Sequence, residues 1–206
     1  MKTESNSYTL VYSTVMVIIV AFLLAFVYQA LKPMQDANVV LDKKKQILYS
    51  LNIRGLDDAS VEAKYKEVIK GVKYIDAEDS LYLAEIDGKP KYIIPMKGMG
   101  LWAGISGLIA INEDKSTVFG AYFDHESETA GLGAEIKDNL EWQEKFQGKH
   151  LFANDKRDQI ALQVIKKVDN PETQVDAVTG ATLTSNGVTN MFKDHLTKYI
   201  KFFNQK

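Results

Sequence analysis

The sequence contains no cysteine in its 206 residues, which excludes structural disulfides, iron–sulfur clusters and thiol nucleophiles. It also has no basic excess, since 25 Lys and Arg stand against 27 Asp and Glu, and this balance argues against nucleic acid as a partner. Three histidines, His125, His150 and His195, lie too far apart to predict a metal site. A chain with 46% hydrophobic and 25% charged residues is globular rather than disordered. Any redox chemistry would therefore use a non-metal cofactor.

Charge is missing altogether from the 27 residues between Glu4 and Lys32. As a helix, residues 11–31 would cover about 31 Å, which matches the hydrocarbon core of a bilayer. The run is longer than the apolar part of a signal peptide, and bulky residues occupy its exit in place of a small-residue cleavage site. The sequence therefore predicts a short tail over 1–10 and an uncleaved transmembrane helix over 11–31. Lysines follow and precede the span, so charge leaves its orientation open.

Residues 32–75 are expected to form a helical stalk and a connecting helix, and residues 76–206 a soluble domain. Pro33 is expected to break the membrane helix at its exit. The connecting helix is expected after Ser60, with Gly71 near its end in a position suited to a C-cap.

Periodicity and turn residues predict two hairpins, one further strand and two helices in the soluble domain. The hairpins join 81–86 to 91–95 through Asp87-Gly88 and 108–112 to 118–123 through a polar turn at 113–115; a helix covers 135–146, a strand 159–166 and the last helix 186–203. Hairpins separated from helices are typical of an α+β domain with an antiparallel sheet.

Two short clusters combine glycine with polar residues. Residues 128–133 bring polar groups, backbone amides and an apolar side chain together, a mixture that suits a heteroaromatic ring with a polar edge. Residues 176–185 place four hydroxyls and a glycine before the last helix, where free amides favour a phosphate. The alternative for this second cluster is an ordinary helix cap by Thr184 or Ser185, and glycines of 104–120 also suit sheet bulges and turns.

The second cluster resembles the flavinylation motif of FMN-binding domains, Asp-x-x-Ser/Thr-Gly-Ala-Ser/Thr, and the first resembles the Glu-Thr-Pro/Ala-Gly-Leu-Gly signature of the same family. In that family a flavin transferase moves FMN from FAD onto the last hydroxyl of the motif, so the resemblance implies covalent FMN at Thr182. The residues implied in cofactor binding are Asp176, Thr179, Gly180, Ala181, Thr182, Thr184, Glu128, Thr129, Gly131 and Leu132. His125 departs from the family pattern, because it lies three residues before Glu128. We expect the flavin ring near residues 129–132, with Trp102 or Trp142 within reach.

Residues 5–9, 31–38 and 98–102 extend the likeness to nearly the whole chain, which is similar to the NqrC family of bacterial Na+-translocating NADH:quinone reductases. The homologous G-type family of the Rnf electron-transport complex is the alternative. This resemblance implies a flavoprotein that carries electrons from NADH toward quinone, coupled to Na+ export, together with other subunits and without catalysis of its own. It also implies an inner-membrane location with the soluble domain on the periplasmic side. From the residues alone, a reversible phospholigand-binding module and a structural subunit without cofactor stay open.

Overall fold

The computed structural model describes residues 5–77 and 79–205. The chain divides into two compact units, of which the first ends at Lys43 and the second is Lys44–Lys206. Helix α1 (Asn6–Ser50) begins in the first unit and ends in the second.

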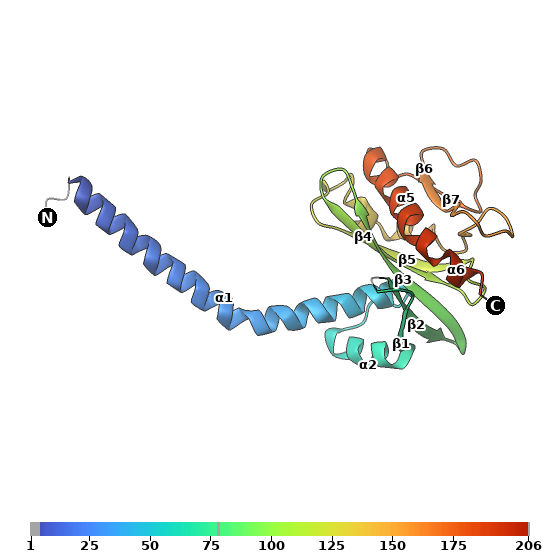
Figure 1. Ribbon diagram of the computed structural model, residues 1–206, viewed down its shortest axis with the longest axis horizontal. Coiled ribbons are helices and arrows are strands. Elements are labelled where there is room, and N and C mark those ends of the chain that lie inside the picture. Colours follow the sequence, from blue (N-terminus) through green and yellow to red (C-terminus); the bar gives the residue numbers. More distant parts are fainter. Residues whose placement is uncertain (1–4, 78, 206) are drawn as a thin grey trace. The chain divides into compact units, whose positions relative to one another are not determined.

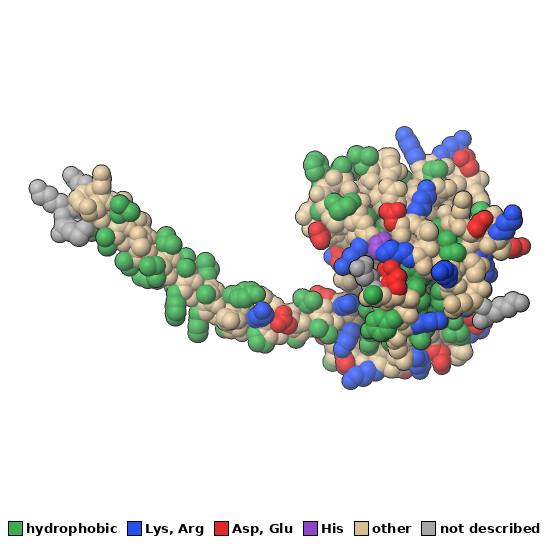
Figure 2. Space-filling model, viewed as in Figure 1, with side chains coloured by type: hydrophobic (Ala, Val, Ile, Leu, Met, Phe, Trp, Pro, Cys, Tyr) green, Lys and Arg blue, Asp and Glu red, His purple; other side chains and the backbone are tan. Residues whose placement is uncertain are grey.

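Helix α1 contains the charge-free run, and its apolar side chains are exposed along the first unit (Figure 2). Among the described residues it is the one helix long and apolar enough to cross a membrane. The helix continues through Pro33, so the expected break there is wrong. Proline removes one backbone hydrogen bond, and the good helix formers on either side hold the rest of the ladder.

The second unit is built on a five-stranded antiparallel sheet in which every strand pairs with the next along the chain (Figure 1). Its strands are β1 (Ile69–Tyr74), β2 (Ser80–Ile86), β3 (Lys89–Met99), β4 (Gly104–Ile111) and β5 (Val118–His125). Both predicted hairpins are confirmed, and Asp87 and Gly88 adopt the positive φ angles of 51° and 71° that a two-residue hairpin turn requires. A third hairpin, between β3 and β4, ends in the loop 100–103, because pairing continues to Met99 and Gly104.

The helical segment expected up to residue 75 ends earlier. Helix α2 (Asp58–Val68) is capped by Asp57, whose Oδ1 accepts from the Ser60 amide at 2.8 Å. Gly71 lies in β1, so its expected role as a C-cap is wrong. Pairing with β2 holds this segment as an extended strand, so the helical segment ends at Val68.

The second half of the chain contains shorter elements than expected. Asn139 divides the expected helix into α3 (Glu135–Asp138) and α4 (Leu140–Glu144), because its backbone is extended and its side chain caps α4. The expected strand at 159–166 shrinks to β6 (Gln163–Ile165), which pairs in parallel with an unpredicted β7 (Gln174–Asp176). The last helix begins four residues early as α5 (Thr182–Leu196), followed by η1 (Thr197–Tyr199) and α6 (Ile200–Phe203).

The sheet is covered on both faces. On one face α5 packs across β3, and a core of aromatic rings centred on Phe123 contacts Trp142, Phe146 and Phe192. On the other face the last turn of α1 supplies Ile47 to a smaller apolar cluster. Successive strand residues point to opposite faces, which is why β3 carries a continuous apolar run. The class is therefore α+β with an antiparallel sheet, as predicted.

Candidate functional site

The two glycine-containing clusters and the β3–β4 loop meet at the N-terminal half of α5. A side chain at Gly180, whose φ is +77°, would come within 2.7 Å of Leu132 Cδ2. A side chain at Gly187 would overlap the carbonyl oxygen of Met99. Glycine is needed at both positions because it lets backbone segments approach closely. Sequence patterns missed Gly187, although a glycine inside a helix is an unfavourable choice that signals a packing constraint.

Glu128 joins these segments through its buried carboxylate. Oε1 accepts from the Trp102 amide at 3.0 Å, and Oε2 accepts from the Thr184 hydroxyl at 2.7 Å. Only 8% of the residue is exposed. Side chains at Gly100 or Gly133 would overlap the carboxylate, so both glycines make room for it. Glu128 therefore binds the β3–β4 loop to the first turn of α5.

Glu128 is negatively charged at neutral pH despite its burial. Desolvation opposes ionisation, but hydrogen bonds from the Trp102 amide and the Thr184 hydroxyl outweigh it and hold the pKa below its ordinary value. The amides of Ala103 and Leu101 lower the pKa further. An ionised carboxylate only accepts hydrogen bonds, and these four groups are all donors.

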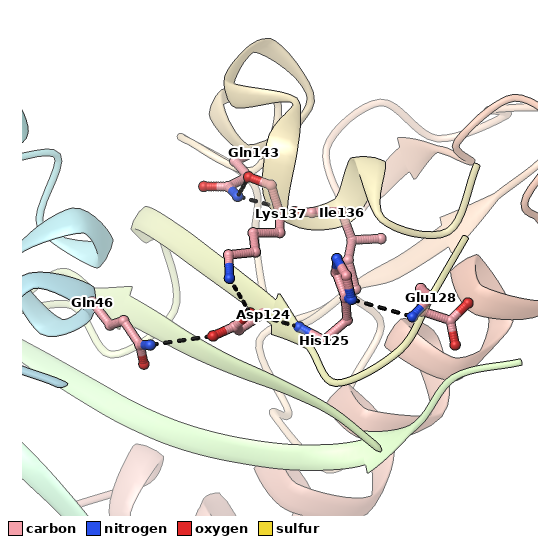
Figure 3. A network of polar contacts seen from close by, with 7 residues as sticks. All are labelled: Gln46, Asp124, His125, Glu128, Ile136, Lys137 and Gln143. Carbon is pink, nitrogen blue, oxygen red and sulfur yellow. Dashed lines mark hydrogen bonds and ion pairs between the residues drawn. The ribbon is translucent and has the colours of Figure 1, made fainter. Parts of the chain in front are cut away.

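A polar network fixes the strand end from which the 128–133 cluster departs (Figure 3). The Glu128 amide donates to His125 Nδ1 at 3.2 Å, which gives this displaced histidine a structural role. Asp124 accepts from Gln46 at 3.2 Å and pairs with Lys137 at 2.8 Å. These bonds connect the end of β5 to the end of α1 and to α3, so the start of the 128–133 cluster is held in place by several elements.

The hydroxyls of the second cluster have different surroundings. Thr182 is the first residue of α5, and its side chain is exposed. Thr184 and Ser185 are buried, the first bonded to Glu128 and the second accepting from the Val178 amide at 3.1 Å. Neither caps α5, so the alternative of a simple helix cap is wrong. The N-cap of α5 is instead Ala181, whose side chain makes no capping bond.

Asp176, the first residue of the motif, lies at the end of β7. Its carboxylate pairs with Lys145 at 2.8 Å on the surface. Its backbone carbonyl accepts from the indole N–H of Trp142 at 2.8 Å. Trp142 itself is buried in the aromatic core. Trp142 therefore bonds the first residue of the motif to the core. Trp102, in contrast, is 68% exposed in the β3–β4 loop.

Exposed apolar side chains occur in each of the segments that meet at the N-terminal half of α5. Leu183 is 59% exposed on the same helical turn as Thr182, and Leu132 is exposed against Gly180. Met99, Leu101 and Trp102 are exposed in and beside the β3–β4 loop. Figure 2 shows hydrophobic side chains at this end of the body. Met99 and Leu183 are not among the residues implied in cofactor binding, although they lie in the segments 98–102 and 176–185 that the sequence analysis singles out.

The structure separates the implied cofactor residues into two groups. Thr179, Gly180, Thr182, Thr129, Gly131 and Leu132 are exposed, whereas Ala181, Glu128 and Thr184 are buried and Asp176 is half-buried. The amide of Leu132 donates to the carbonyl of Thr129 within its own turn at 3.1 Å. With the Glu128 amide also in use, two of the amides expected at the ring's polar edge are not available to a ligand.

These features fit a phosphate-linked aromatic cofactor. Thr182 offers an oxygen at the start of a 15-residue helix, where the free amides favour a negative charge. The adjoining exposed apolar side chains suit the faces of a flat ring.

Comparison with known proteins agrees with this chemistry. The FMN-binding domain family matches residues 100–197. The chain is 31% identical to the NqrC subunit of the Na(+)-translocating NADH-quinone reductase of Pseudomonas aeruginosa, with 95% of this chain and 93% of that protein covered. It is also 31% identical to the corresponding subunit of Haemophilus ducreyi, with 92% and 89% covered. The crystal structure of the corresponding subunit from Parabacteroides distasonis matches with a TM-score of 0.77 at 33% identity, and covers 85% of this chain and 98% of that one.

Fold and site thus define an FMN-binding domain joined to a helix able to span a membrane. More particularly, the chain belongs to the NqrC family, the FMN-binding-domain subunits of the Na(+)-translocating NADH-quinone reductase. This assignment confirms the family predicted from the sequence and favours it over the Rnf alternative.

Proposed function

We propose that this chain carries a covalent FMN on Thr182 and serves as an electron-carrying subunit of a Na+-translocating NADH:quinone reductase. Membership of the NqrC family supports the assembly, and the FMN-binding domain supports the cofactor. The attachment site is supported by the contrast among the four hydroxyls. Thr184 and Ser185 are buried and bonded, whereas Thr179 and Thr182 are exposed. Of the two exposed threonines, only Thr182 lies in α5, at its first residue, where free amides favour a phosphate.

Attachment needs a partner enzyme, because a threonine hydroxyl is a weak nucleophile without a base. In the proposed step, Thr182 Oγ1 attacks the FMN phosphorus of FAD and a new P–O bond forms. The pyrophosphate bond breaks, AMP leaves, and the hydroxyl proton passes to a base of the flavin transferase. The product phosphodiester keeps one negative charge, which the amides at the start of α5 stabilise by about 0.3–1 kcal/mol.

The attached FMN supplies one-electron transfer between neighbouring carriers. The chain's own residues bind and orient it: Thr182 holds the phosphate, while Leu132, Leu183 and Trp102 present apolar surface that excludes water from the ring. Electrons from NADH would pass through this site toward quinone within the complex, coupled to Na+ export. Helix α1 would anchor the chain in the inner membrane, with the second unit on the periplasmic side.

Intact mass and peptide mapping test the attachment in the full chain co-expressed with a flavin transferase. The wild type and Thr182→Ser should gain the mass of FMN less water, and Thr182→Ala should not. The mapped peptide should carry FMN at residue 182 alone. Thr197→Ala is the matched control and should gain the mass of FMN less water, because Thr197 is an exposed threonine at the other end of α5, outside both signatures. FMN mapped to Thr179, Thr184 or Ser185 would contradict the proposal.

A further inference from the structure

The carboxylate of Glu128 does not face the exposed surface where the cofactor is proposed to lie. It is enclosed between Gly100 and Gly133, and its two oxygens are directed to different parts of the chain. One holds the loop that presents Trp102, and the other holds the first turn of α5. A carboxylate so placed has little access to a ligand, although the resemblance implies a direct binding role.

The bond to Thr184 acts on the orientation of Thr182. The two residues belong to the same helical turn, and α5 has no side-chain cap to fix its start. Glu128 is itself held by the bond from its amide to His125, at the end of β5 (Figure 3). Rotation of the first turn is therefore restrained by a connection that runs from β5 through Glu128 to Thr184.

The bond from the Trp102 amide to Glu128 acts on the β3–β4 loop. The loop 100–103 lies between Met99 and Gly104, the last residues that pair across the β3–β4 hairpin, and the Trp102 side chain on it is largely exposed. The Glu128 carboxylate accepts from the amides of this loop, so it sets the position of the exposed Leu101 and Trp102 side chains relative to the first turn of α5.

We infer that Glu128 is a positioning residue for flavin attachment and does not contact the flavin itself. It orients the Thr182 acceptor through its bond with Thr184, and it orients the apolar side chains of the loop 100–103 through its bond with Trp102. This inference rests on the proposed function. It assigns the glutamate of the signature a role in aligning two chain segments with each other.

The experiment compares full-length variants in detergent and measures the initial rate of FMN attachment by a flavin transferase, by intact mass. Thr184→Val removes the hydroxyl that donates to Glu128, and Thr184→Ser retains it. Glu128→Asp shortens the reach by one methylene, so that one carboxylate cannot span both partners. Thr189→Val is the matched control, because Thr189 is a buried hydroxyl of α5 that bonds Val164 away from the site.

Thr184→Val and Glu128→Asp should slow attachment on the order of tenfold or more, since small misplacements of a reacting group carry large rate losses. Thr184→Ser and Thr189→Val should attach FMN at a rate close to that of wild type. A second readout needs no flavin: the fluorescence anisotropy of Trp102 should fall in Glu128→Asp and stay unchanged in Thr184→Val, which leaves the loop bonds intact. The variant Trp102→Phe identifies the Trp102 signal against that of buried Trp142.

Wild-type rates of attachment in both Thr184→Val and Glu128→Asp would overturn the positioning role and leave the proposed function standing. An equal loss in Thr189→Val would also overturn it, because the effect would then reflect general loosening of α5. A wild-type chain that acquires no FMN would overturn the proposed function as well, and the intact mass of the wild type distinguishes this case.

Discussion

The indole N–H of Trp142 donates to the carbonyl oxygen of Asp176 at 2.8 Å, so the flavinylation-type motif is bonded directly to the aromatic core. Trp142→Phe should lower the free energy of unfolding by about 1–3 kcal/mol, because it leaves this carbonyl without its partner. Chemical denaturation of the full chain in detergent measures the change. Trp102→Phe is the control and should stay within about 0.5 kcal/mol, because Trp102 is largely exposed. Equal losses in the two variants would contradict the structural role assigned to Trp142.

Much of the fold was predictable because its signals are local. The Asp87-Gly88 turn and the alternation around it identify a hairpin without any tertiary information, and the structure confirms it. The short β6–β7 pair depends on tertiary contacts that local propensity does not report. The continuation of α1 through Pro33 was missed for another reason, because the single hydrogen bond lost at proline was given more weight than the helix formers beside it. The strand β1 begins at Ile69 because β2 offers it a partner, whereas the sequence pattern alone suits a continued helix.

Gly180 offers a test of the close approach between the two signatures. Both Gly180 and Gly148 have positive φ angles, of 77° and 75°. A Cβ added at Gly180 would lie 2.7 Å from Leu132 Cδ2, whereas a Cβ added at Gly148 would have no atom within 4 Å. Replacement of either glycine by alanine should destabilise the fold by about 1–2 kcal/mol through backbone strain. Gly180→Ala should in addition displace Leu132 and reduce FMN attachment, measured by intact mass. Similar attachment in Gly180→Ala and Gly148→Ala would show that this contact is not needed.

The sequence predicts the site only as two separate signatures. How the two lie against each other depends on a third segment, the β3–β4 loop 100–103, which bonds Glu128 through the Trp102 amide. Thr182 and Leu132 were identified by resemblance, and the structure places both on the exposed side. Nothing in the local sequence distinguishes Thr184 from Thr182 as a hydroxyl. The distinction comes from Glu128, which reaches Thr184 across 56 residues of chain.

His195 in the last turn of α5 predicts a pH effect. Burial, with the nearby charge of Lys198, lowers its pKa below 6.5, while Asp79 acts in the opposite direction. The ring also accepts from the Lys97 amide at 3.3 Å, which requires an unprotonated nitrogen. The unfolded chain then binds the proton more readily, so the free energy of unfolding should fall as the pH drops below about 6.5.

Denaturation of the wild type and His195→Gln at a series of pH values measures this effect. Glutamine keeps an acceptor for the Lys97 amide but does not titrate. The difference in stability between wild type and variant should therefore shift against the wild type between about pH 7 and pH 5. A difference that is constant over this range would show that the ring is not held neutral.

The start of the compact body at Lys44 can be tested by truncation. Ile47, Leu48 and Leu51 are buried in the second unit, each at 1–2% exposure. Their burial contributes roughly 4–9 kcal/mol, which is comparable to the whole stability of a domain. A chain that begins at Lys44 should be soluble and unfold cooperatively, whereas a chain that begins at residue 53 should not fold, as circular dichroism and sedimentation would report. Cooperative unfolding of the shorter chain with equal stability would place the domain boundary nearer residue 76, as the sequence pattern suggested.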